Sequence, residues 1–446
     1  MRVRIFFLSA AFGLVCACVS HSEDVSYTAV APGKGFSKTN VFVTFSEGSD
    51  VASRVADILS FDLEFPGKFK TRRRALDYDA YKKFLEKDNR KALFKSGVDI
   101  AAFVEASGKP GKKGQKVSVT ARSMANGKTL ASTTQYFLPA NFVANAHKVS
   151  ADALKALTGN SGVCTSTIAW SEGKDIFIGD YACMQAVRLI ESPGKKFTLS
   201  WHQKEPKLFF SQETEKNSRL MEANLKGKER ICFSYPGLNM QFSPSDDGKK
   251  AFVCLTADKG NTELFLFDEK VCKKVGQPAF KQLTKNSGTN VSPCYLSDGN
   301  MVFCSDYEYK RPQIYFMDIK RNKSCRITFN QPYCASPTYC AKTNKIVYVS
   351  PVEKVFQLFS LDLDDLKKGK APTTKQLTFS KGDKLSPSLH ESGEFVSFVT
   401  GGRDDGGELK SQLAIYNLLN NQVKIMSKGR SDRRYPAWTE RQLYAL

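Results

Sequence analysis

Histidine is scarce in this sequence, with 4 residues among 446, at positions 21, 147, 202 and 390. No pair of them has the H-x-x-H or H-E-x-x-H spacing of a zinc protease. A G-x-S-x-G nucleophile elbow and a glycine-rich phosphate-binding motif are also absent, and GGRDDGG at 401–407 is interpreted as a polar loop. The sequence therefore predicts no catalytic residue, no metal ligand and no cofactor, and structural roles for His147 and His202.

Long hydrophobic runs are missing too, except at the start of the chain. Arg2 and Arg4 precede a short apolar run, Ile5 to Val15, which small residues follow, as in a secretory signal peptide. We assign 1–21 to this signal and 22–39 to an N-terminal flexible segment. The VCAC sequence suits ordinary signal peptidase and also resembles a bacterial lipobox, in which Cys18 would be lipidated.

Cysteines are few before residue 164 and frequent after it. Ten of the 12 lie from Cys164 onward. Cys254 and Cys304 occupy positions where a strand takes a small apolar residue, which favours core thiols. Export to an oxidising compartment leaves one or two disulfides as the alternative. Cys334 and Cys340 lack a second C-x-x-C pair, which argues against zinc.

The net charge of +21 is large, but its lysines are scattered beside turns. A scattered distribution indicates solvated faces, and export argues against a nucleic-acid partner. We therefore expect the charge to serve solubility and the attraction of an acidic partner.

Residues 40–160 are predicted to form a small α/β domain. The stretch from Val51 to Leu59 has helical spacing, and NVFVTFS and GVDIAAFVEASG read as strands. Asn126-Gly127 predicts a hairpin turn, and a last helix is expected to end at Gly159.

From 163 to 446 the helical periodicity disappears and a repeat begins. A proline-containing phrase recurs at steps of about 44 to 51 residues. Its copies begin at Ser192, Ser243, Ser292, Ser336, Ser386 and Tyr435. Four short strands at this period indicate an all-β propeller, because each sheet is apolar on both faces and must stack on its neighbours. The fold class is therefore multi-domain, an α/β domain followed by a six-bladed β-propeller.

Two features of the repeat have structural interpretations. The third strand of a unit ends in Asp268, Asp318, Asp362 or Asn417, which we expect to bond the following turn. The first unit lacks its proline start, and RYPAWT at the C-terminus lacks a continuation. We therefore expect the two ends to complete one blade together and to leave no open edge, with Trp438 packed against the neighbouring blade.

A signal peptide, an α/β domain ending in LTG and a propeller closing on YPAWT resemble the TolB family, the periplasmic components of bacterial Tol-Pal systems. The resemblance spans nearly the whole chain. It implies a non-catalytic periplasmic scaffold that binds the peptidoglycan-associated lipoprotein, and TolA through the N-terminal segment, and that supports outer-membrane integrity and cell division. The loop at 234–244 lacks a histidine that some members have. Membrane contact is expected only through partners or a Cys18 lipid.

The resemblance places the lipoprotein at one mouth of the propeller channel, on the loops that lead into the blades. The matching positions are Asn290, Ser292, Tyr333, Ala335, Ser336, Lys384, Ser386, Arg433, Arg434 and Tyr435. Tyr333 and Tyr435 are the expected anchors, and Lys384, Arg433 and Arg434 the expected rim charges. These residues could also serve only to begin strands. The alternative function is an exported propeller enzyme or small-ligand binder with a site in the channel.

Overall fold

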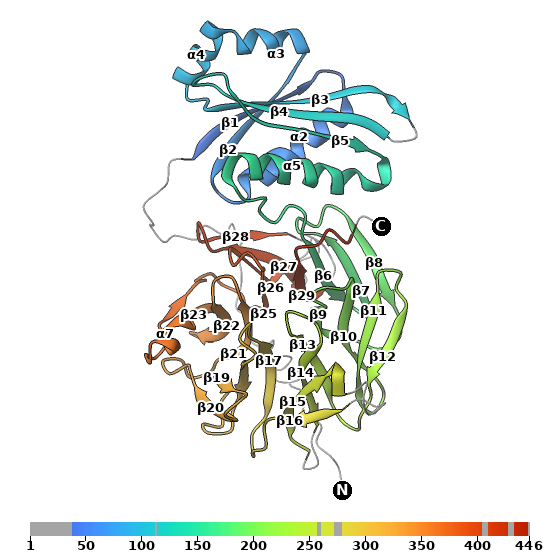
Figure 1. Ribbon diagram of the computed structural model, residues 1–446, viewed down its shortest axis with the longest axis vertical. Coiled ribbons are helices and arrows are strands. Elements are labelled where there is room, and N and C mark those ends of the chain that lie inside the picture. Colours follow the sequence, from blue (N-terminus) through green and yellow to red (C-terminus); the bar gives the residue numbers. More distant parts are fainter. Residues whose placement is uncertain are drawn as a thin grey trace.

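The computed structural model describes residues 38–111, 114–256, 260–271, 279–403, 409–426 and 432–444. The expected signal peptide, Cys18 and nearly all of the 22–39 segment lie outside these residues, as does part of 401–407. Figure 1 shows two parts, an N-terminal domain with helices and a larger part built of strands. Within the described residues, no helix combines the length and the apolar character needed to span a bilayer.

The N-terminal domain contains a five-stranded sheet in the order β2-β1-β3-β4-β5. Its strands are β1 (Thr39–Ser46), β2 (Phe69–Leu76), β3 (Ile100–Gly111), β4 (Gly114–Ser123) and β5 (Thr129–Phe137). β1 pairs in parallel with β2 and β3, and the other pairs are antiparallel. The predicted hairpin joins β4 to β5, with Gly127 at a φ of 77°.

Helices cover both faces of this sheet (Figure 1). They are α2 (Asp50–Glu64), α3 (Tyr78–Leu85), α4 (Lys87–Lys95) and α5 (Phe142–Thr158), with a short 3-10 turn at Pro139–Asn141. α2 and α5 pack on one face around a shared apolar core and lie nearer the propeller. α5 ends at Gly159, whose φ of 79° is the left-handed conformation of a helix end. α3 and α4 lie on the outer face and, like β2, were not predicted from the sequence.

Six four-stranded antiparallel sheets form the propeller, which confirms the predicted fold class. Blade 1 contains β29 (Arg433–Thr439), β6 (Thr167–Glu172), β7 (Asp175–Asp180) and β8 (Ala186–Glu191). Blade 2 contains β9 (Lys196–Trp201), β10 (Lys207–Glu213), β11 (Ser218–Asn224) and β12 (Glu229–Phe233). Blade 3 contains β13 (Asn239–Pro244), β14 (Lys250–Thr256), β15 (Thr262–Asp268) and β16 (Phe280–Gln282).

The remaining blades follow the same order. Blade 4 contains β17 (Asn290–Tyr295), β18 (Met301–Ser305), β19 (Gln313–Asp318) and β20 (Lys323–Arg326). Blade 5 contains β21 (Ala335–Cys340), β22 (Lys345–Val352), β23 (Val355–Asp362) and β24 (Thr374–Gln376), with α7 (Asp364–Lys367) between its last strands. Blade 6 contains β25 (Lys384–Leu389), β26 (Phe395–Arg403), β27 (Leu409–Asn417) and β28 (Gln422–Ile425). The inner strands β9, β13, β17, β21, β25 and β29 contact one another in a closed ring.

The first and last strands of the propeller complete one blade together, as expected. β29 pairs antiparallel with β6, so the last described strand and the first propeller strand share blade 1. Trp438 is buried in an apolar cluster that joins blade 1, through Ile168, to blade 6, through Val399. The prediction of its packing between these blades is therefore confirmed, and this blade has no unpaired inner edge.

The expected turn chemistry at the end of the third strand is also confirmed. The Asp268 and Asp362 carboxylates accept bonds of 2.9 Å from the backbone N–H of Lys270 and Asp364. Asp318 and Asn417 bond their own turns in the same way. Asp180 of blade 1 does so as well, bonding the N–H of Ala182 at 2.8 Å.

The nine cysteines that the structure describes are all unpaired. Cys254 and Cys304 are buried in their strands, which agrees with the interpretation as core thiols. No cluster of three or more His, Cys, Asp or Glu side chains suited to a metal ion occurs in the described part of the chain.

Candidate partner-binding face

Every inner strand contains one residue in the left-handed conformation. These residues are Thr198, Gln241, Ser292, Ser336, Ser386 and Tyr435, with φ between 49° and 55°. Positive φ is uncommon outside glycine. At each of them the pairing with the second strand shifts register, which marks a β-bulge. The six-fold repeat therefore places one bulge per blade at the channel.

The sequence alignment of the blades was wrong in two places. Ser243-Pro244 lies two residues beyond the bulge residue Gln241, and Ser192-Pro193 lies before β9 rather than at its bulge residue Thr198. The fold requires a left-handed residue at the bulge, and proline follows that residue in only four of the six blades. The proline-containing phrase therefore marks the bulge correctly only in those four blades, as Ser-Pro in three of them and as Tyr435-Pro436 in blade 1.

A buried donor two residues before the bulge holds the preceding loop in blades 2, 3, 4 and 6. The ammonium of Lys384 donates to the carbonyls of Ser380, Lys381 and Gly382 at 2.5 to 2.9 Å. The Lys196 ammonium likewise bonds the carbonyl of Ser192. The amides of Asn239 and Asn290 occupy the same position and bond oxygens of their own loops. We call the loops that precede the inner strands the mouth loops.

This position corrects one predicted role. Lys384 was expected to be a rim charge, yet its side chain is 1 % exposed. Burial lowers its pKa to about 8, against an opposing effect of Asp383. Lysine can fill a buried site only when its donors are satisfied, and here backbone carbonyls satisfy them. Lys384 is therefore enclosed by its own loop and holds the loop backbone through these hydrogen bonds.

The other predicted site residues divide into buried and accessible groups. Asn290 and Ala335 are buried, and Ser292, Ser336, Ser386, Tyr333, Arg433 and Tyr435 are half-buried. Arg433 bonds Glu172 at 3.1 Å and stacks over Trp170, whereas Arg434 is exposed beside Asp432. Tyr333 packs edge-on against Phe356, with 5.5 Å between ring centroids. Tyr435 lies 6.5 Å from Phe197 between ring centroids, so each expected anchor already contacts an aromatic ring of the propeller.

Exposed aromatic side chains on the same face were missed by the sequence reasoning. Phe329 and Phe379 follow the fourth strands of blades 4 and 5 at equivalent positions, and they are 50 % and 67 % exposed. Tyr309, in the turn between β18 and β19, is 53 % exposed. The Arg326 guanidinium lies 4.0 Å from the Tyr309 ring and 4.8 Å from that of Phe329. The signal in the sequence was a Thr-Phe pair repeated in RITFN and QLTFS.

The TolB beta-propeller domain family matches residues 154–442. This chain belongs to that family. The crystal structure of TolB from Acinetobacter baumannii superposes with a TM-score of 0.75 at 21% identity, covering 90% of this chain and 97% of that one. A putative TolB from Agrobacterium tumefaciens superposes with a TM-score of 0.45 at 16% identity, covering 59% of this chain and 88% of that one. Hydrazine synthase from Kuenenia stuttgartiensis superposes with a TM-score of 0.50 at 14% identity, covering 62% of this chain and 46% of that one. At these identities the structural likeness concerns the fold alone.

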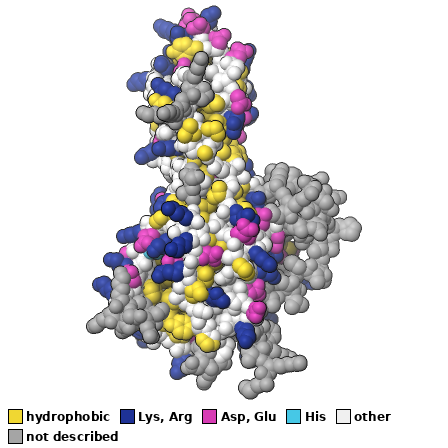
Figure 2. Space-filling view, turned by 90° about the vertical axis from the view of Figure 1, so that its right-hand side faces the viewer, with side chains coloured by type: hydrophobic (Ala, Val, Ile, Leu, Met, Phe, Trp, Pro, Cys, Tyr) yellow, Lys and Arg dark blue, Asp and Glu magenta, His cyan; other side chains and the backbone are white. Residues whose placement is uncertain are grey.

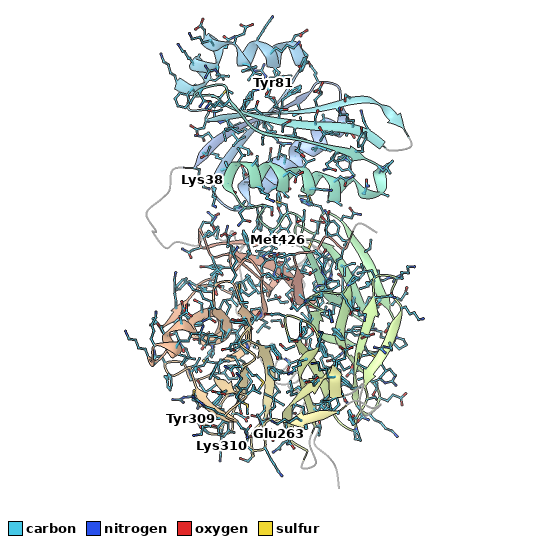
Figure 3. All side chains as sticks on the ribbon, in the orientation of Figure 1. Lys38, Tyr81, Glu263, Tyr309, Lys310 and Met426 are labelled. Atoms are coloured by element: carbon cyan, nitrogen blue, oxygen red, sulfur yellow. The ribbon has the colours of Figure 1, made fainter. Side chains whose placement is uncertain are left out.

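In this TolB-family chain the N-terminal domain docks away from the mouth loops. Its contacts include the turn after β25, where Asn160 bonds Glu394, and the ends of the third strands β7 and β27. In an antiparallel blade the first and third strands end on the same side, and the mouth loops lie on the other. In Figure 3 Tyr309 is labelled at the end of the propeller farthest from the N-terminal domain. The mouth face therefore stays clear of that domain.

A buried ionic cluster joins the two domains of this TolB-family chain. His147 of α5 lies 2.8 Å from the Asp62 carboxylate of α2 and 3.4 Å from that of Asp180 in blade 1. The Tyr181 hydroxyl donates to Asp62 at 2.5 Å. Burial alone lowers the pKa of His147, but the two carboxylates outweigh it and raise the pKa to about 10. The imidazolium is thus held between an acid of each domain.

Proposed function

We propose that this TolB-family chain is a non-catalytic periplasmic scaffold of the Tol-Pal system. It binds the peptidoglycan-associated lipoprotein at the propeller mouth and so supports outer-membrane integrity and cell division. The observation that carries the proposal is the construction of the mouth face. Lys384 and Asn290 are buried and donate to backbone carbonyls of their loops, while Phe329 and Phe379 project into solvent. A rigid frame with exposed aromatic groups suits a protein partner, because little ordering is required on binding.

The variation among the mouth loops supports the same function. Their sequences KNSGTNVSP, NQPYCASP and SKGDKLSP differ from blade to blade, although the sheets beneath them repeat. A repeated sheet serves folding, and varied loop tips serve recognition. The net charge of +21 favours an acidic partner, so the association rate should fall as salt rises. A contact of the N-terminal segment with TolA belongs to the same proposal.

Binding of the purified soluble domain of the lipoprotein, measured by calorimetry, tests the proposal. We expect the double variant Phe329→Ser, Phe379→Ser to bind at least about thirtyfold more weakly, since exposed aromatic anchors dominate such interfaces. Tyr136→Ser is the matched control, because Tyr136 is a 49 % exposed aromatic residue of the N-terminal domain. No binding by the unmodified chain, or equal binding by the double variant, would contradict the proposal.

A further inference from the structure

The segment from Lys70 to Lys95 is unusually basic. It contains ten Lys and Arg residues against four Asp and Glu, a net charge of +6 in 26 residues. It forms β2, α3 and α4, at the edge and on the outer side of the N-terminal sheet (Figure 1). In Figure 2 Lys and Arg side chains project around the outer end of this domain. The basic residues of this segment are concentrated, whereas basic and acidic residues are interspersed along the propeller sequence.

The basic side chains of β2 face the same side as α3 and α4. The side chains of Thr71 and Arg73 contact Glu64 and Asp57 of α2, so the odd-numbered residues of β2 face the propeller side. Because side chains alternate along a strand, Arg72 and Arg74 face the opposite side, and both are exposed. Arg72 is paired in register with Phe42, which contacts Phe84 of α3 at 5.9 Å between ring centroids. We call this surface the β2–α3–α4 face.

The lysines of α4 carry a cost that folding does not explain. Lys87, Lys91 and Lys95 recur at every fourth position, so they form one stripe along the helix. Like charges at this spacing destabilise a helix. None of the ion pairs among the described residues involves any of these three lysines, and α4 buries none of its side chains. The stripe is therefore suited to an anionic surface outside the molecule.

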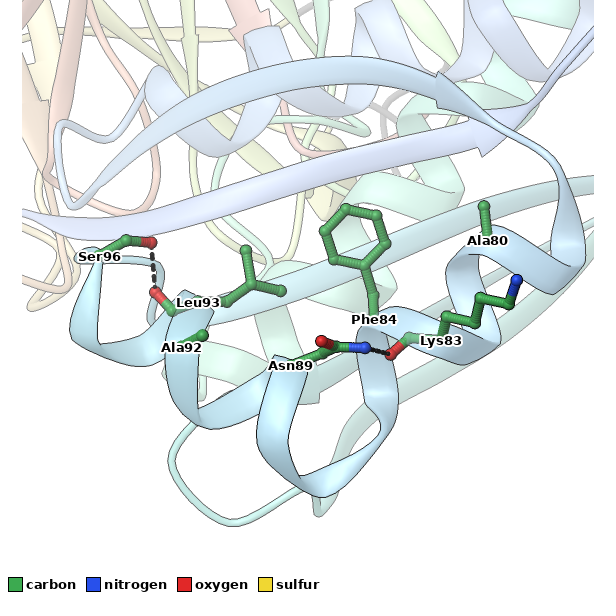
Figure 4. A pocket seen from close by; sticks show the side chains of 7 residues that line it. All are labelled: Ala80, Lys83, Phe84, Asn89, Ala92, Leu93 and Ser96. Atoms are coloured by element: carbon green, nitrogen blue, oxygen red, sulfur yellow. Dashed lines mark hydrogen bonds between the residues drawn. The ribbon is translucent and has the colours of Figure 1, made fainter.

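Apolar groups accompany the charges. Tyr78 and Phe94 are 50 % and 46 % exposed. Between α3 and α4 lies an open pocket of about 560 Å³. Its apolar lining includes Phe84 and Leu93, and Lys83 stands at its edge (Figure 4). Lysines around half-exposed aromatic side chains are typical of protein surfaces that lie at a bilayer interface.

We propose that the β2–α3–α4 face binds the anionic headgroups of a lipid bilayer. Charge complementarity favours this occupant: a layer of phosphates offers negative charge under every lysine and requires no matched geometry. Lysine is a flexible point charge, and five of the six cations on α3 and α4 are lysines. An acidic protein, in contrast, would be recognised better by oriented arginine forks. The surface is separate from the propeller mouth, so the inference does not depend on the proposed function.

Vesicle co-sedimentation tests this inference. The exported chain carries Cys18→Ser, so that no acyl group is attached. It is mixed with vesicles of phosphatidylcholine containing a quarter phosphatidylglycerol, or of phosphatidylcholine alone. We expect binding to the anionic vesicles only, release at high salt, and about a hundredfold weaker binding for Lys87→Glu, Lys91→Glu, Lys95→Glu.

The matched control places the same three charge reversals on exposed propeller lysines, as Lys226→Glu, Lys228→Glu, Lys323→Glu. Its binding should stay within about twofold of the unmodified chain, because the charge change is equal and only the position differs. Absence of vesicle binding, or equal losses in both triple variants, would overturn the inference. Binding to soluble polyglutamate without binding to vesicles would also overturn it and would assign the face to an acidic protein.

Discussion

A chain that ends before β29 is expected to lose the closed propeller and to associate through the exposed edge of β6. β29 pairs with β6 from Arg433 to Thr439, and its backbone bonds are the closure of the ring. The Trp201 indole N–H donates to the Ala437 carbonyl at 3.1 Å, which ties β29 to blade 2 as well. An unpaired inner strand would present unsatisfied N–H and C=O groups, a template for another chain.

Thermal unfolding and the molar mass in solution, both measured on the truncated chain, show whether the ring is closed. We expect the truncated chain to be aggregated or oligomeric without a sharp transition. Trp438→Ala, which keeps the strand, should lower the free energy of unfolding by about 3–5 kcal/mol because it empties a buried indole site. Arg434→Ala, at an exposed position of the same strand, is the control and should change it by less than about 0.5 kcal/mol. A truncated monomer with an unchanged melting temperature would contradict this account of closure.

The second large effect is expected at the interdomain cluster. Replacing His147 by Ala leaves the buried carboxylates of Asp62 and Asp180 without their shared cation. Removing one partner of a buried ion pair lowers the free energy of unfolding by about 3–5 kcal/mol. Because the cluster joins the domains, the loss should appear as a lower unfolding midpoint and as faster proteolysis between 159 and 163. A His147→Ala protein as stable and protease-resistant as the original would show that the domains are held by other contacts.

The same cluster predicts a pH dependence with a defined sign. The pKa of His147 is raised in the folded chain to about 10, above its ordinary value of 6.5. A raised pKa means that the stabilisation is complete below pH 6.5 and is lost as pH rises towards 10. The unfolding midpoint should therefore fall across this window. Asp62→Asn removes one of the two charges that raise the pKa and should make the fall shallower. An equally steep fall in Asp62→Asn would contradict the assignment.

Much of the fold could be predicted because its signals are local. The helix at Asp50–Glu64, the hairpin at Gly127 and the helix end at Gly159 follow from spacing and turn residues within a few positions. The six blades follow from a period repeated along the sequence. The aspartates and asparagine that end the third strands bond N–H groups only two or three residues away.

Other features depend on contacts that the sequence does not display. β2 is an edge strand with charged residues on both faces, and α4 buries no side chain, so neither has the apolar period that marks an element. The bulge residues Thr198 and Gln241 carry no proline signal. Lys384 reads as a surface charge, and only the folding of its own loop around the ammonium buries it. The cluster of Asp62, His147 and Asp180 joins positions far apart in the sequence, since Asp62 and His147 are 85 residues apart.

Hydrogen–deuterium exchange with and without the soluble lipoprotein domain tests the proposal that the propeller mouth is the partner-binding face. When the lipoprotein domain binds, we expect slower exchange in the mouth loops at 285–292, 329–336 and 379–386. Exchange within the N-terminal domain, residues 39–158, should stay unchanged. Protection confined to 39–158, with the three mouth loops exchanging as in the free chain, would contradict the proposal.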